Sequence, residues 1–105
     1  MTSANEPALR VALLGQFAVW RDGEQVSESA WPRKKTKDLL KVLLTAPGKF
    51  FLVDQLVEAL FPASDPRRAA SNVQSRISEL RRVLEPNLKH GRDSSYIVRR
   101  GEAYR

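Results

Sequence analysis

Between residues 65 and 86, apolar side chains recur at intervals of three and four residues. Such intervals place them on one side of an α-helix. Asp65 is a suitable N-cap, Pro66 fits the first helical turn and Pro86 stops the helix. The pattern predicts a helix over 66–85 whose buried stripe consists of Ala70, Val73, Ile77, Leu80 and Leu84.

The opposite side of this helix is polar, but it lacks the many Glu and Lys residues that usually fill a solvated helix face. Its short side chains would let a partner approach the backbone, and Arg and Asn can pair with base edges in a DNA major groove. The pattern favours a DNA-binding face, and the alternative is an ordinary solvated surface. The face comprises Arg68, Ser71, Asn72, Ser75, Ser78, Glu79 and Arg82, with Gln74 and Arg76 at its flanks.

The first third of the chain has the pattern of short strands. Residues 9–26 are rich in β-branched and aromatic side chains, which predicts a small antiparallel sheet with one buried face. Asp22-Gly23 is a strong turn signal between strands at 17–21 and 24–26. Residues 1–8 are expected to be a disordered lead-in, which leaves 9–105 as one domain.

Further along the chain the pattern becomes helical. Leucines at helical spacing predict a helix over 33–45, and Pro47-Gly48 ends it. A short strand at 50–52 and a second helix over 53–61 come before the long helix. A polar loop then leads to a hairpin over 96–105. This order predicts an α+β fold, a winged helix-turn-helix with an N-terminal antiparallel sheet, three helices and a C-terminal β-hairpin wing.

The positive charge of the chain is concentrated after the predicted N-terminal sheet. The net charge is +6, yet residues 1–32 contain two basic and four acidic side chains. Residues 33–60 contain six basic and three acidic ones, and residues 61–105 contain ten and five. This distribution points to a polyanion or an acidic surface as the partner. Lys34, Lys35 and Lys37 oppose the dipole of their helix. Together with Thr36 they are candidates for phosphate contact, although a solvated lysine run is equally compatible.

Nothing in the sequence indicates catalysis, a cofactor or a membrane. The chain has no Cys, and its apolar runs are far too short to cross a bilayer. The N-terminus lacks the pattern of a signal peptide, so a soluble cytoplasmic protein is expected. His90 is alone, and no catalytic or metal-binding motif is present. We expect no enzyme activity, and we interpret "GRDSS" at 91–95 as a loop and not as a phosphorylation site.

Four segments carry a family resemblance: "LLGQFAVWRDG", "PGKFFLVDQLVEALFP", "ASNVQSRISELRRVLEP" and "YIVRRGEAYR". Together they resemble the OmpR/PhoB-type winged helix of the bacterial SARP transcriptional activators (the antibiotic regulatory proteins). The resemblance implies binding to direct repeats in promoter DNA, often as side-by-side protomers. It also implies that the connection between the second and third helices faces RNA polymerase.

The resemblance also assigns roles to particular residues. It makes 66–84 the recognition helix, and its wing pattern matches Arg100, Gly101 and Tyr104, with Arg100 approaching the minor groove. Arg99 should point to the opposite face of the hairpin by strand alternation. The predicted DNA-binding residues are Arg68, Ser71, Asn72, Ser75, Arg76, Glu79, Arg82, Arg100, Lys34 and Lys35. For Glu79 an intrahelical pair with Arg76 or Arg82 is an equal alternative, and Arg81 is expected to form a structural pair.

The sequence departs from the family pattern at three places. Phe61-Pro62 stands where a Trp-Pro commonly closes the second helix. Leu52 replaces a Ser that often caps this helix, so its start should depend on packing. Family members continue into a helical activation domain, whereas this chain stops at Arg105, which suggests a fragment of a longer regulator.

The sequence therefore predicts sequence-specific binding to double-stranded promoter DNA by a bacterial transcriptional activator. The alternative is a winged helix that docks on RNA polymerase or on a neighbouring regulatory domain. A protein-docking face should be apolar and poor in Arg, which the polar face of the long helix is not.

Overall fold

The computed structural model of the chain describes residues 9–13, 16–87, 90 and 94–105. The predicted lead-in at 1–8 lies outside the described residues. The chain divides into two compact units, Met1–Ala30 and Trp31–Arg105, which are described separately.

The N-terminal unit contains a three-stranded antiparallel sheet. Its strands are β1 (Leu9–Ala12), β2 (Ala18–Arg21) and β3 (Glu24–Gln25), in that spatial order. Asp22 and Gly23 both have positive φ, 50° and 83°, as the turn of a two-residue hairpin requires. The predicted hairpin is thus confirmed, and a 3-10 helix, η1 (Glu28–Ala30), follows it.

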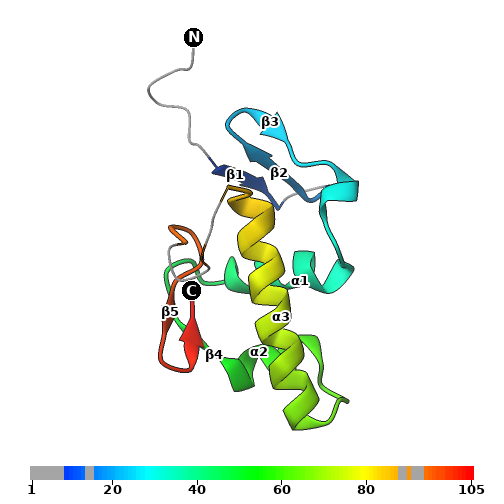
Figure 1. Ribbon diagram of the computed structural model, residues 1–105, viewed down its shortest axis with the longest axis vertical. Coiled ribbons are helices and arrows are strands. Elements are labelled where there is room, and N and C mark those ends of the chain that lie inside the picture. Colours follow the sequence, from blue (N-terminus) through cyan, green and yellow to red (C-terminus); the bar gives the residue numbers. More distant parts are fainter. Residues whose placement is uncertain (1–8, 14–15, 88–89, 91–93) are drawn as a thin grey trace. The chain divides into compact units, whose positions relative to one another are not determined.

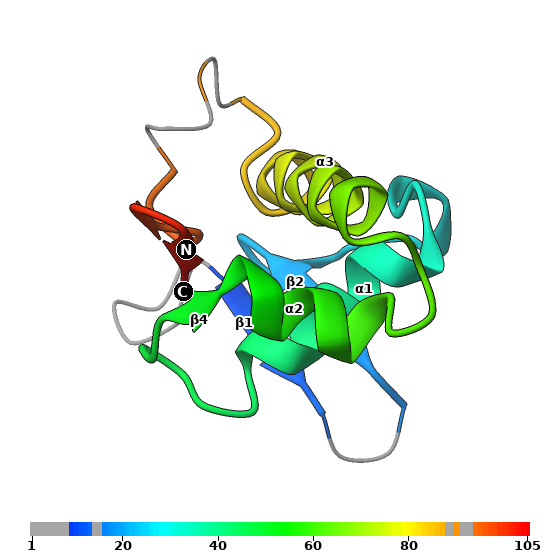
Figure 2. The same ribbon diagram turned by 90° about the horizontal axis from the view of Figure 1, so that it is seen from below.

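The second unit is built on three helices, α1 (Lys34–Leu43), α2 (Val53–Leu60) and α3 (Pro66–Leu84). Figure 2 shows α1 and α2 together on one side of α3. Their apolar stripes form the core, as the sequence pattern predicted, except that Ala69 and not Ala70 is the buried alanine of α3. The most deeply buried side chains of this core are Leu39, Leu56, Val73, Ile77 and Leu80.

The starts of α2 and α3 are fixed by side chains. The Asp65 carboxylate accepts a hydrogen bond from the Arg67 amide at 2.9 Å, and Pro66 occupies the first turn, as predicted for α3. For α2 the expectation of packing alone was wrong. The Leu52 amide donates to Gln55 Oε1 at 2.9 Å. The side chain of the third helical residue thus accepts a hydrogen bond from the backbone of the residue that precedes the helix.

A second sheet adjoins these helices. It contains β4 (Phe51–Leu52), β5 (Arg99–Arg100) and β6 (Ala103–Tyr104) in the order β4-β6-β5, all antiparallel. Gly101, with φ of 59°, lies in the turn between β5 and β6. The hairpin lies beside α3 in Figure 1. Sheet, helices and hairpin follow one another in the predicted α+β order.

Candidate nucleic-acid interface

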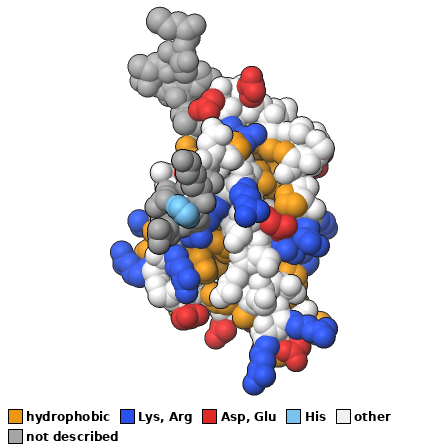
Figure 3. All heavy atoms as spheres, in the orientation of Figure 1, with side chains coloured by type: hydrophobic (Ala, Val, Ile, Leu, Met, Phe, Trp, Pro, Cys, Tyr) orange, Lys and Arg blue, Asp and Glu red, His pale blue; other side chains and the backbone are white. Residues whose placement is uncertain are grey.

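The exposed side of α3 carries short polar and basic side chains. Because Val73, Ile77 and Leu80 face the core, the residues on the opposite side of the helix are left at the surface. Figure 3 shows Lys and Arg side chains at several places on the face drawn. Five of the predicted DNA-binding residues are exposed along α3: Arg68, Ser71, Asn72, Ser75 and Arg82.

Arg76 is not part of this exposed surface, which corrects the prediction. Its side chain is only 11% exposed and forms an ion pair with Glu79, one turn along α3. Arg76 lies at the edge of the polar side of α3, and the Glu79 carboxylate with which it pairs is also bonded to Thr36 of α1. The intrahelical pair considered as the alternative for Glu79 is therefore present, and Arg76 is the partner.

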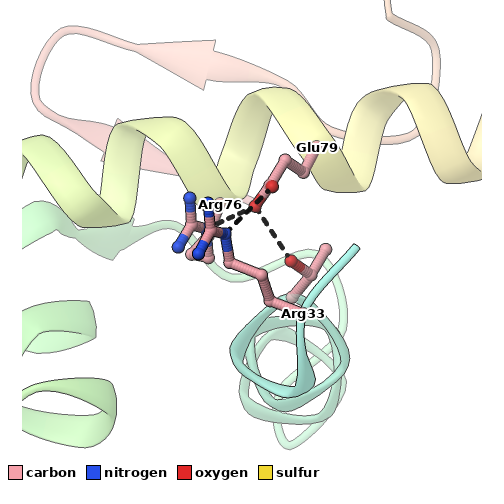
Figure 4. A network of polar contacts seen from close by, with 4 residues as sticks. Arg33, Arg76 and Glu79 are labelled. Carbon is pink, nitrogen blue, oxygen red and sulfur yellow. Dashed lines mark hydrogen bonds and ion pairs between the residues drawn. The ribbon is translucent and has the colours of Figure 1, made fainter. Parts of the chain in front are cut away.

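Glu79 also connects α3 to the start of α1. Its carboxylate accepts a hydrogen bond from Thr36 Oγ1 at 3.1 Å and one from Arg33 Nε at 3.4 Å (Figure 4). Thr36 is fully buried, so the prediction that it contacts phosphate was wrong, whereas the Arg33 side chain is 61% exposed. Glu79 is thus a structural centre on which two cations and a hydroxyl converge. The sequence could not show this, because Arg33 and Thr36 are more than forty residues away along the chain.

Two of the three lysines that are candidates for phosphate contact, Lys34 and Lys35, have different surroundings. Lys34 is exposed at the first residue of α1. Lys35 Nζ donates to the Leu60 carbonyl at 2.6 Å and lies 5.4 Å from the centre of the Phe61 ring. Lys35 therefore places a positive charge at the C-terminus of α2, where the helix dipole favours it. Lys35 thus has a structural role at the end of α2 in addition to the phosphate contact predicted for it.

Replacement of Lys35 by Met is expected to lower the free energy of unfolding by about 1 kcal/mol, because the last carbonyl of α2 loses a charged donor. Urea unfolding followed by circular dichroism measures this change. Lys34→Met is the matched control, since Lys34 sits at the N-terminal end of a helix, where positive charge is unfavourable. Equal destabilisation by both substitutions would contradict the capping role.

The two arginines of β5 lie on opposite faces of the hairpin, as strand alternation predicted. Arg99 Nε donates to the Gly101 carbonyl at 2.8 Å, and its guanidinium lies 6.0 Å from the Tyr104 ring. The Arg100 guanidinium lies instead over Phe50, 4.6 Å from the ring centre. Both side chains are exposed, so either can reach a partner.

The C-terminal turn of α3 is bonded to the segment that enters the hairpin. Arg81 donates from Nε and Nη2 to the Ile97 carbonyl at 3.2 and 3.1 Å. Partial burial lowers the pKa of Arg81. The structural role expected for Arg81 is confirmed, although its hydrogen-bond partner is a carbonyl.

Glu85, which directly follows α3, supplies the second part of this connection. Its carboxylate accepts hydrogen bonds from Ser94 Oγ and from the Ser95 amide, the latter at 3.0 Å. Ser94 Oγ also accepts from the Ile97 amide at 3.1 Å, and Ser94 is buried. Sequence reasoning missed both residues, because helical periodicity gives no information about contacts between a helix end and a loop. Positions 91–93 of the "GRDSS" segment lie outside the described residues.

Two further observations concern chemistry and membranes. In the part of the chain that the structure describes, no group of three or more His, Asp or Glu side chains could hold a metal ion. None of the helices described is long and apolar enough to cross a bilayer.

Three helices whose last member presents a polar, basic face beside a β-hairpin define a winged-helix DNA-binding domain. Residues 27–105 match the family model described as "Transcriptional regulatory protein, C terminal", and the chain belongs to this family. It is the OmpR/PhoB-type DNA-binding domain of a transcriptional regulator, as the sequence predicted.

Two comparisons with individual proteins agree with this assignment. The chain is 34% identical over 92 residues to the regulatory protein AfsR of Streptomyces coelicolor, which makes it SARP-like. It also resembles the solved structure of Mycobacterium tuberculosis EmbR in complex with a low-affinity phosphopeptide, with a TM-score of 0.74 and 26% identity. The matches cover 88% and 95% of this chain, but only 9% of AfsR and 25% of the EmbR chain.

Proposed function

We propose that this domain binds promoter DNA sequence-specifically, with α3 in the major groove and the β5–β6 hairpin at the minor groove. The observation that carries the proposal is the exposed side of α3, where Asn72 and Ser75 lie between Arg68 and Arg82. Short side chains in the middle let the helix come close to base edges, and the arginines at either end can reach phosphates or guanines.

Each exposed residue then has a role. Arg68 lies in the first turn of α3, where its charge and the free backbone amides of the helix together suit a phosphate group. Asn72 and Ser75 read bases, and Ser71 permits the close approach. Arg82 contacts a base or a phosphate farther along the groove. Arg100 contacts the minor groove from the hairpin.

Arg76 and Glu79 have a different task in this proposal. They hold α3 against α1 through the network with Arg33 and Thr36, so they fix the angle at which the exposed side of α3 is presented. A rigid support of this kind favours specific recognition, because less freedom is lost when the complex forms.

The comparisons support a wider proposal for the whole protein. Because the chain corresponds to a small part of AfsR and EmbR, we infer that it belongs to a longer regulator. We propose that this regulator is a cytoplasmic activator whose protomers bind side by side at direct repeats, in contact with RNA polymerase.

Salt dependence tests the proposed mode of binding. With about five phosphates neutralised, the logarithm of the association constant should fall against the logarithm of salt concentration with a slope of roughly −4 to −5. Fluorescence anisotropy with a labelled duplex at several salt concentrations gives this slope. Binding that is insensitive to salt would contradict phosphate anchoring by Arg68 and Lys34, and absence of binding would contradict the proposed function.

A further inference from the structure

Two guanidinium groups lie over one aromatic ring beside the hairpin. The Arg100 guanidinium lies 4.6 Å from the centre of the Phe50 ring, and the Arg105 guanidinium lies 4.9 Å from it. Phe50 directly precedes β4, Arg100 lies in β5 and Arg105 directly follows β6. The ring therefore brings together two cations from different elements of the sheet.

The hydrogen-bond register of the sheet explains this arrangement. Val98 and Arg105 exchange both backbone hydrogen bonds at 3.0 Å, so Arg105 continues the hairpin past β6. Because Arg100 pairs with Ala103, alternation places Arg100 and Arg105 on the same face of the hairpin. The pairing of Phe51 with Tyr104 puts Phe50 opposite Arg105 by extension. Backbone geometry thus holds the ring and both arginines on one face.

Apart from their contact with the Phe50 ring, the guanidinium groups of both arginines are available for a partner in the described part of the chain. Arg99 donates to the Gly101 carbonyl, but no hydrogen bond or ion pair engages the guanidinium of Arg100 or Arg105 among the described residues. Both side chains are exposed. Two like charges at one ring repel each other, and the face of an aromatic ring offsets only part of that repulsion. An anion bound between them would offset the rest.

We propose that Phe50, Arg100 and Arg105 form a binding site for the phosphodiester backbone of DNA. In this site Arg100, placed above at the minor groove, contacts the phosphates that border that groove. Arg105 is a phosphate contact in addition to those assigned above, and Phe50 is a positioning residue that acts through both arginines. The proposal rests on the proposed DNA-binding function and deepens it. A planar guanidinium pairs with phosphate through two parallel hydrogen bonds, and a ring that restricts its orientation reduces the entropy lost on binding.

Substitutions at Phe50 and Arg105 test this site on the chain as it stands, with a labelled duplex. Arg105→Gln is expected to make the salt slope shallower by about 0.9, the value for one phosphate contact. Phe50→Leu is expected to weaken binding about three- to tenfold, because both arginines lose the ring that orients them. Phe50→Tyr retains a ring and should bind within about twofold of the unmodified chain.

Two controls separate positioning from a general effect on folding. Phe51→Leu removes the ring of the next residue, but that ring lies near Lys49 and on the other face of the sheet, so DNA affinity should stay unchanged. In a chain that already carries Arg100→Gln and Arg105→Gln, adding Phe50→Leu should cause no further loss. Thermal unfolding of each variant shows whether the fold is retained.

The outcomes distinguish this proposal from the proposed function. If the unmodified chain binds DNA but Arg105→Gln leaves the salt slope unchanged, or Phe50→Leu acts equally with and without the two arginines, the ring site is wrong while DNA binding stands. If the unmodified chain binds no DNA, both proposals fail. Proton NMR of the free chain gives a measurement independent of DNA, in which the Arg100 and Arg105 Cδ protons should be shifted upfield by the ring and should lose that shift in Phe50→Leu.

Discussion

Replacing Glu79 by Ala is expected to lower the free energy of unfolding by about 2–3 kcal/mol. Arg76 would keep its charge in a nearly buried position without a carboxylate, and the buried Thr36 hydroxyl would lose its acceptor. The loss of the pair with the exposed Arg33 side chain should contribute little. Urea unfolding monitored by circular dichroism measures the change.

Two variants make this result specific. Glu79→Gln retains an acceptor for Thr36 and should be less destabilising than Glu79→Ala. Ser78→Ala changes the neighbouring exposed residue, and it should leave stability unchanged or slightly raised because Ala favours the helix. If Glu79→Ala kept full stability and instead changed which DNA sequences are bound, Glu79 would be a base-reading residue and the structural role given to it here would be wrong.

Asn72→Ala is expected to have the opposite profile, with a large loss in binding and none in stability. Asn72 is exposed, so its removal leaves no buried group unpaired, and Ala is the better helix former. Loss of a paired hydrogen bond to a base should weaken binding to the preferred duplex by about 1–3 kcal/mol. The difference between preferred and unrelated duplexes should shrink by the same amount.

Gln74→Ala is the matched control for Asn72→Ala. Gln74 is also an exposed amide on α3, but it lies on the flank of the helix away from Asn72. Titrations of both variants against a preferred and an unrelated duplex give the comparison. An equal loss on both duplexes would make Asn72 a phosphate contact. Equal effects of Asn72→Ala and Gln74→Ala would contradict the base-reading role assigned to Asn72.

The elements that the sequence predicted well are those with local signals. Asp65 and Pro66 mark the start of α3, and Asp22-Gly23 marks a hairpin, because the relevant contacts join residues a few positions apart. The core stripe of α3 follows in the same way from helical spacing. The exposed side of α3 is the side opposite this core stripe. The sequence therefore also located the surface on which the proposed function depends.

Most of what the sequence could not show concerns contacts between elements. Helical periodicity put Arg76 at the edge of the polar side, but it could not show that this side chain is nearly buried. In the same way it could not show that Lys35 of α1 reaches the end of α2. The hydrogen bond at the start of α2 was missed for a local reason. The expectation considered only the Leu52 side chain, whereas the acceptor is the Gln55 side chain three residues later.

Selection from a random pool of DNA duplexes, at near-physiological salt and read by sequencing, tests the central claim most directly. We expect the chain to enrich a short motif and expect the chain carrying Asn72→Ala and Arg82→Ala to lose that enrichment while remaining folded. Binding without an enriched motif, or a motif that persists in the double variant, would contradict base reading by the exposed side of α3.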